Sequence, residues 1–103
     1  MHPFNFSALA LLTDIDVKQK NYAESIEYNK RYLEIRPTDY NMWMFLSQTQ
    51  LTMGDSLNGA KSAYRAMEIA PDVLQVQQFW QTRFTSEYRD QVLKLHSTNR
   101  EQR

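Results

Sequence analysis

Cysteine is absent from this sequence of 103 residues, and glycine and proline are scarce, with two and three residues respectively. Without cysteine the chain has no disulfide framework, no thiolate nucleophile and no thiolate metal ligand. These absences exclude cysteine-based redox, metal and nucleophilic chemistry. Because residues that interrupt helices and strands are so few, the position of each glycine and proline indicates where an element ends.

The sequence also lacks an excess of charge of either sign, since 12 lysines and arginines balance 12 aspartates and glutamates. No net field draws the molecule toward nucleic acid or an anionic membrane surface, so we expect neither as a partner. The longest apolar run, residues 4–12, is far shorter than the ~20 residues that span a bilayer. It also lacks the flanks of a signal peptide, and we interpret it as the first core helix. The compartment stays undetermined, with the cytoplasm as the default.

Motifs that carry chemistry are absent as well. The two histidines, His2 and His96, stand in no H-E-x-x-H motif, and no glycine-rich phosphate loop or G-x-S-x-G occurs. Asp14 and Asp16, two residues apart on a predicted helix, point to different sides. We therefore predict no enzyme, no catalytic residue, no cofactor, no metal and no small-molecule substrate.

An internal repeat is present, because "LEIRP" at residues 33–37 matches "MEIAP" at residues 67–71. The spacing corresponds to a repeat of two helices with a period of about 34 residues. Within the second copy Gly54 supplies a left-handed residue that ends one helix, and Asp55 can cap the next. Pro71 stops that second helix. The pattern predicts two helical hairpins, each made of two helices joined by a turn.

The first copy has helices predicted at about 7–19 and 22–35, but its turn differs. Lys20 stands in place of Gly54, so a left-handed residue there costs about 1 kcal/mol. Asn21 can cap the second helix, with Glu24 reaching back as in a capping box. In the second copy we expect Trp43 to anchor the core of the hairpin.

After Pro71 the pattern changes. Asp72 can cap a new helix, and apolar residues recur every three or four positions from Val73 to Leu95. Either one helix of about 23 residues or a bend near Ser86 fits this pattern, and we favour the bend because residues 85 and 86 are poor helix formers. Two and a half repeats are marginally stable. The chain is therefore either a piece of a longer protein or self-associates, with its best contact candidates at Tyr88, Val92 and Leu95.

The second copy resembles the tetratricopeptide repeat family. The resemblance rests on the aromatic and leucine positions, the turn, the small position and the final proline, here Trp43, Leu46, Gly54, Asp55, Ala66 and Pro71. It implies an all-α fold of antiparallel helix-turn-helix repeats, stacked as a short right-handed solenoid of five or six helices. The predicted organisation is a lead-in (1–5), repeat one (6–39), repeat two (40–73), an irregular third segment (74–97) and a polar tail (98–103). An ordinary helical bundle is the alternative.

In this family the first helix of each repeat lines a concave groove. The positions carried over are amide- and hydroxyl-rich: Asp14, Asn41, Met44, Gln48, Leu51, Gln75, Gln78 and Thr82, with Ser7, Ala10, Val17 and Thr85 beside them. Ala10 and Asp14 replace the lysine and asparagine of the carboxylate-clamping members, so we expect no such clamp. Side-chain amides can hold an extended peptide. The other interpretation is a solvated face without a ligand.

The resemblance implies a non-catalytic module that binds a peptide or helix of a partner protein in this groove. The alternative function is structural, namely an assembly element that self-associates or stacks on adjoining repeats through its C-terminal helix.

Overall fold

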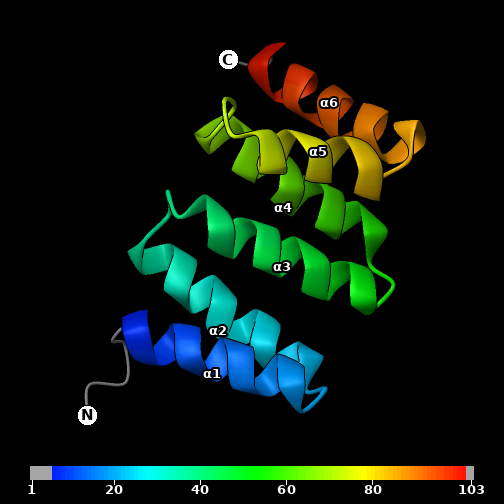
Figure 1. Cartoon of the computed structure of the whole chain (residues 1–103). Helices are drawn as coiled ribbons and strands as arrows, with labels where there is room; N and C mark the ends of the chain where they lie inside the picture. The colour runs from blue at the N-terminus through cyan, green and yellow to red at the C-terminus, as the bar shows by residue number, and fades with distance from the viewer. Residues whose placement is uncertain (1–5, 102–103) are drawn as a thin grey trace.

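A computed structural model describes the backbone of residues 6–101 and the side chains of residues 7–96. The regular secondary structure of this part of the chain is all α-helical, as expected of an all-α repeat (Figure 1). Its helices are α1 (Phe6–Lys18), α2 (Tyr22–Ile35), α3 (Tyr40–Thr52), α4 (Ser56–Ile69), α5 (Leu74–Arg83) and α6 (Ser86–Glu101). None of them combines the length and the apolar character that crossing a membrane would require.

The helices stack in chain order along the long axis of a molecule measuring 44 × 28 × 26 Å (Figure 1). α1 packs on α2 and α3 packs on α4, which makes two hairpins, and α2 packs on α3 to join them. α4 then carries both α5 and α6. The two ends of the stack are consequently α1 and α6.

The sequence repeat is visible in the hydrogen bonds of the two hairpin turns. Lys20 N donates to Val17 O at 3.0 Å, and Gly54 N donates to the equivalent oxygen of Leu51 at 2.9 Å. Both turn residues are left-handed, with φ of 64° at Lys20 and 83° at Gly54. Lys20 is thus the left-handed residue of the first turn, and it carries the cost that glycine avoids.

The predicted caps have mixed outcomes. Asp55 caps α4 by accepting from Asn58 N at 3.3 Å. Asn21 occupies the N-cap position of α2, but its side chain turns to Gln19 and makes no cap hydrogen bond, so the predicted capping box is wrong. The predicted cap at Asp72 is also wrong, because Val73 occupies the N-cap position and α5 begins only at Leu74.

The third segment consists of two helices, so the bend is confirmed. α5 has only ten residues, against thirteen in α1 and α3. It ends where Phe84 adopts an extended conformation, with φ −128° and ψ 139°, and α6 follows from Ser86. The buried ring of Phe84 fixes this break to the core.

The core forms two clusters. The first joins α1, α2 and α3 through Leu9, Tyr32, Leu33 and Leu46. The second is larger and more aromatic and joins α4, α5 and α6 through Ala60, Ala63, Phe79, Trp80, Phe84 and Val92. Trp43 is only partly buried at the edge of the first cluster, so the expected core-anchor role is wrong. Leu46, 3% exposed, fills that role instead.

Gly59 allows α3 and α4 to approach closely. A Cβ atom on this residue would lie 3.3 Å from both Leu51 Cγ and the carbonyl oxygen of Ser47. The hydroxyl of Ser47 donates to the oxygen of Gly59 at 2.6 Å, which ties the two helices together at their crossing. This close packing positions α3 and α4, two of the helices that line the pocket described next.

Candidate partner-binding pocket

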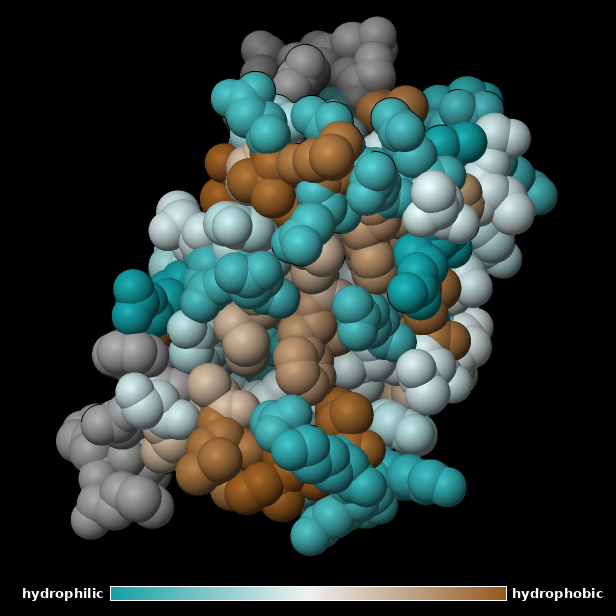
Figure 2. All heavy atoms as spheres, in the orientation of Figure 1, coloured by the Kyte–Doolittle hydropathy of each residue, from teal (hydrophilic) through white to brown (hydrophobic). Residues whose placement is uncertain are grey.

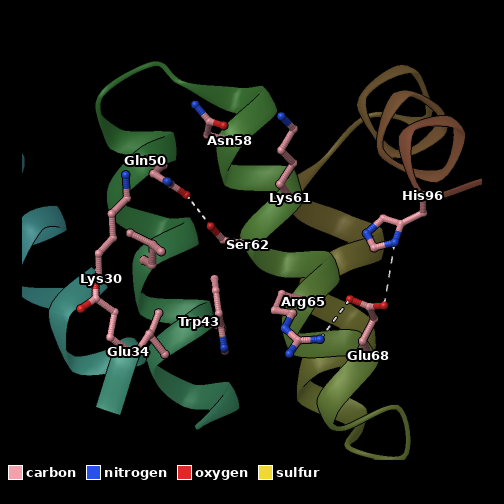
Figure 3. A pocket seen from close by; sticks show the side chains of 12 residues that line it. Lys30, Glu34, Trp43, Gln50, Asn58, Lys61, Ser62, Arg65, Glu68 and His96 are labelled. Atoms are coloured by element: carbon pink, nitrogen blue, oxygen red, sulfur yellow. Dashed lines mark hydrogen bonds and ion pairs between the residues drawn. The ribbon is translucent and has the colours of Figure 1, made fainter. Parts of the chain in front are cut away.

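A pocket of about 860 Å³ lies between the two hairpins (Figure 3). α2, α3 and α4 supply most of its wall, and α6 adds His96. Its lining combines apolar, amide and charged side chains: Lys30, Leu33, Glu34, Trp43, Leu46, Gln50, Asn58, Lys61, Ser62, Arg65, Glu68 and His96. A cavity of this size accommodates several side chains of a peptide.

The apolar part of the pocket comes from the junction of α2 and α3. Leu33 and Leu46 are buried members of the first core cluster, and Trp43 projects into the pocket between α2 and α4 (Figure 3). The indole Nε1 of Trp43 donates to the carbonyl oxygen of Pro37 at 2.9 Å. This hydrogen bond orients the ring, so that a flat apolar surface is presented before any ligand arrives.

The polar wall between α3 and α4 is internally satisfied. Ser62 Oγ donates to Gln50 Oε1 at 2.7 Å, and both side chains are buried. Their positions are consequently fixed by packing and hydrogen bonding. The Nε2 amide group of Gln50 keeps its donor capacity because the hydrogen bond uses only its oxygen.

Two lysines frame the pocket from opposite sides. Lys30 on α2 and Lys61 on α4 point toward the end where Asn58 lies (Figure 3). Neither lysine forms an ion pair with another residue of the described chain. Because both ammonium groups are exposed and uncompensated, this end of the pocket favours a negatively charged group.

The other end of the pocket holds an acidic pairing. Glu68 lies 3.5 Å from Arg65 and 3.9 Å from Nδ1 of His96. The imidazole of His96 also packs against the ring of Tyr64, with centroids 4.4 Å apart and ring planes tilted by 53°. These contacts connect α6 to α4 at the border of the pocket. Glu34, the second acid of the lining, lies on α2 across the pocket from Glu68 (Figure 3).

The lining of the pocket combines basic, acidic, amide and aromatic side chains. Three basic and two acidic side chains line an apolar floor, in addition to His96. Among residues 7–96 no group of three histidine, cysteine, aspartate or glutamate side chains could hold a metal ion. What the lining offers is recognition by charge, amide hydrogen bonding and an indole surface.

The residues predicted to line a groove lie on α1, α3 and α5, outside this pocket. On α3 they occupy the side of the helix opposite Trp43, Leu46 and Gln50. Met44 and Leu51 are half-buried and pack against the second core cluster. Asp14 is engaged by Lys18 at 3.1 Å. The exposed members, Asn41, Gln48, Gln75, Gln78 and Thr82, stay predicted contact residues.

The predicted self-association residues on α6 separate into different environments. Val92 is 1% exposed and belongs to the second core cluster, because α6 packs its Val92 side on α4. It offers no surface to another chain in this fold, which corrects the prediction for that residue. Tyr88 is half-buried against the same cluster, and Leu95 is exposed.

The sequence analysis did not single out the pocket residues on the second helices, among them Lys30, Lys61 and Arg65. The ion pair found on α2 joins Arg31 to Glu27 at 3.6 Å. One signal was present in the repeat, because Glu34 and Glu68 occupy equivalent positions of its two copies. Both prove to line the pocket.

The fold and site define a class of protein, an all-α helical repeat with a charged and apolar pocket between its hairpins. No protein-family model matches the chain, and no curated protein matches it.

Proposed function

We propose that this chain is a non-catalytic protein-binding module of the tetratricopeptide repeat type, which holds a short segment of a partner protein in the pocket between α2, α3 and α4. The observation that carries the proposal is the pairing of an oriented indole, Trp43, with two uncompensated lysines, Lys30 and Lys61. The period of the internal repeat and the hairpin turns support the assignment to this type of repeat.

The segment that fits is one with an acidic residue next to a large apolar residue. The acidic group would meet Lys30 and Lys61, and the apolar side chain would lie on Trp43 above Leu33 and Leu46. Backbone groups of the segment can bond Gln50 and Asn58. The predicted groove on α1, α3 and α5 is the rival location, and the experiment below separates the two.

The test begins with peptide selection on the immobilised full chain from a random display library, followed by synthesis of the enriched peptides. We expect enrichment of aspartate or glutamate beside leucine, phenylalanine or tryptophan. Binding should change the emission of Trp43, which lines the pocket. The variant Trp43→Phe retains the buried Trp80 and should lose most of the signal.

Variants then locate the site. Lys30→Glu with Lys61→Glu should lower the affinity for the selected peptide by roughly tenfold or more, because two favourable charges become repulsive. Asn41→Ala with Gln48→Ala is the matched pair for the groove and should leave affinity unchanged. The proposal for the pocket is wrong if the second pair abolishes binding while the first does not, or if selection enriches no sequence.

A further inference from the structure

The charged side chains of the pocket are sorted along its two long walls. Lys30 precedes Glu34 on α2, and Lys61 precedes Glu68 on α4. α2 and α4 are the second helices of the two hairpins and run in the same direction (Figure 1). On each wall the glutamate therefore lies farther along that direction than the lysine. The rise of an α-helix separates each lysine from its glutamate by about 6 Å on α2 and about 10 Å on α4.

Glu34 is an acid of the lining that has no ion pair with another residue of the described chain. It stands four residues after Lys30, the spacing at which Glu27 pairs with Arg31 on the same helix. Lys30 and Glu34 do not pair, and both are exposed. The order of lysine before glutamate is also the less favourable one for such a pair on a helix. The carboxylate of Glu34 is thus free to bind a cation of a ligand.

Glu68 on the opposite wall is partly engaged within the chain. Its Oε1 lies 3.5 Å from Arg65, and its Oε2 lies 3.9 Å from Nδ1 of His96. The negative charge of Glu68 is therefore largely balanced by Arg65, which leaves Glu34 as the stronger attractor for a cation. The pocket consequently offers two unpaired ammonium groups and one unpaired carboxylate.

The exposed apolar side chains of α1 lie outside this pocket. Leu11, Leu12 and Ile15 gather at the lower end of the view in Figure 2, and none of them belongs to the pocket lining. Within the lining both leucines are buried, so Trp43 supplies the accessible apolar surface. The arrangement of charges is what distinguishes the pocket from the patch on α1. We therefore expect charge to select the ligand of the pocket.

We propose that the segment bound in this pocket carries opposite charges, with an acidic group held by Lys30 and Lys61 and a basic side chain held by Glu34. Its large apolar residue packs on Trp43. This inference rests on the proposed function, because it names the chemistry of the segment that the pocket holds. A separation of about 6–10 Å corresponds to about two or three residues of an extended segment. A segment without the basic side chain leaves the carboxylate of Glu34 without a partner.

The test uses the peptides enriched on the immobilised full chain, with affinities measured by isothermal titration calorimetry. We expect a lysine or arginine two or three residues from the acidic residue. Replacing that base by glutamate should lower the affinity by about fivefold, the effect expected of an exposed ion pair. Glu34→Lys should restore the affinity for this reversed peptide and lower it for the original one. Both effects should shrink at high salt concentration.

Glu24→Lys is the matched control, because Glu24 is exposed on the same helix but lies outside the pocket lining. It changes the net charge of the chain by the same amount and should leave both affinities unchanged. The gain of binding to the reversed peptide shows that the Glu34→Lys chain is folded.

The outcomes separate this inference from the proposed function. A peptide that depends on Lys30 and Lys61 but is indifferent to Glu34→Lys overturns the inference and leaves the pocket as the binding site. Equal effects of Glu24→Lys and Glu34→Lys overturn it as well, because net charge alone then explains them. If selection enriches no peptide, the proposed function fails and this inference fails with it.

Discussion

The two hairpins have the same arrangement of two helices, but the hydrogen bond between their helices has its donor on the second helix in one and on the first helix in the other. In the first, Ser25 on α2 donates to the carbonyl oxygen of Thr13 on α1 at 2.9 Å. In the second, Ser47 on α3 donates to the carbonyl oxygen of Gly59 on α4 at 2.6 Å. Thr13 and Ser47 are equivalent positions of the repeat, as are Ser25 and Gly59. The contact between the helices is retained although the donor has changed helix.

The hairpins differ in how well buried polar groups are satisfied. In the first, Asn29 Oδ1 and Nδ2 and Asp16 Oδ2 are buried without a hydrogen-bond partner in the described part of the protein. Their equivalents in the second are Ala63, which is apolar, and Gln50, which bonds Ser62. Each orphaned polar group costs about 1–3 kcal/mol. We therefore expect the first hairpin to be the less stable half and the aromatic cluster of the second half to contribute more to the stability of the array.

The largest expected effect tests that division of stability. Trp80→Ala should destabilise the chain by about 3–5 kcal/mol, because the indole fills the second core cluster. Trp43→Ala should cost much less, since that ring lies at the edge of the first cluster and is only partly buried. Urea denaturation followed by circular dichroism measures both at one protein concentration. Equal losses of unfolding free energy in the two variants would contradict the placement of Trp43 outside the core.

The next prediction exchanges the polar groups between the hairpins. Asn29→Leu removes two orphaned atoms at similar volume and should stabilise by about 1–2 kcal/mol. Ala63→Asn places the same amide in the second hairpin and should destabilise by at least as much. Denaturant midpoints report both changes. If Asn29→Leu is destabilising, the amide has partners that matter and the contrast between the hairpins fails.

A smaller effect is expected from exchanging the left-handed residues of the two turns, Lys20 and Gly54. Lys20→Gly should stabilise by about 1 kcal/mol, because glycine adopts the left-handed conformation without the steric cost of a side chain. Gly54→Lys should destabilise by about the same amount, and nothing within 4 Å of its position obstructs the added Cβ. Melting temperatures of the two variants are the measurement. Changes of the same sign in both would refute the equivalence of the turns.

The smallest expected effect is a loss of folding stability at alkaline pH, which arises from Tyr32 in the first hairpin. Burial, and then the hydrogen bond that its hydroxyl donates to Asp39 at 2.5 Å, raise the pKa of Tyr32 above its ordinary value of 10.0. The folded chain therefore keeps this proton when the unfolded chain has released it. Stability is unaffected below the ordinary pKa and falls as the pH rises above it. Urea midpoints between pH of about 9 and 11 should show this fall, and Tyr32→Phe should reduce it.

Local features of the sequence predicted much of this fold. The repeat period and the glycine and proline positions placed both hairpin turns, and the poor helix formers at Thr85 and Ser86 located the break between α5 and α6. The capping box at Asn21 is not formed, because the side chain turns toward Gln19, where its Nδ2 donates to Oε1 at 3.5 Å, and its oxygen accepts no cap hydrogen bond. Periodicity also could not tell that Val92 faces α4, because that depends on how α6 packs.

The pocket was beyond sequence reasoning for a related reason. Its lining comes from four helices, and the lysines that frame it, Lys30 and Lys61, belong to two different hairpins. No spacing rule connects them, since the distance between the hairpins is set by side chains such as Tyr32 and Leu46 at their junction. The charge pattern of each helix alone indicates only an exposed face.

The most direct test of the pocket as the binding site is nuclear magnetic resonance mapping of the labelled chain with an enriched acidic peptide. We predict that the largest changes in amide and indole shifts fall on Lys30, Trp43 and Lys61 and on their neighbours across the junction of α2, α3 and α4. The same peptide with lysine in place of its acidic residue should produce little change. Shifts concentrated on Asn41, Gln48 and Gln75 would contradict the account and return the partner to the groove.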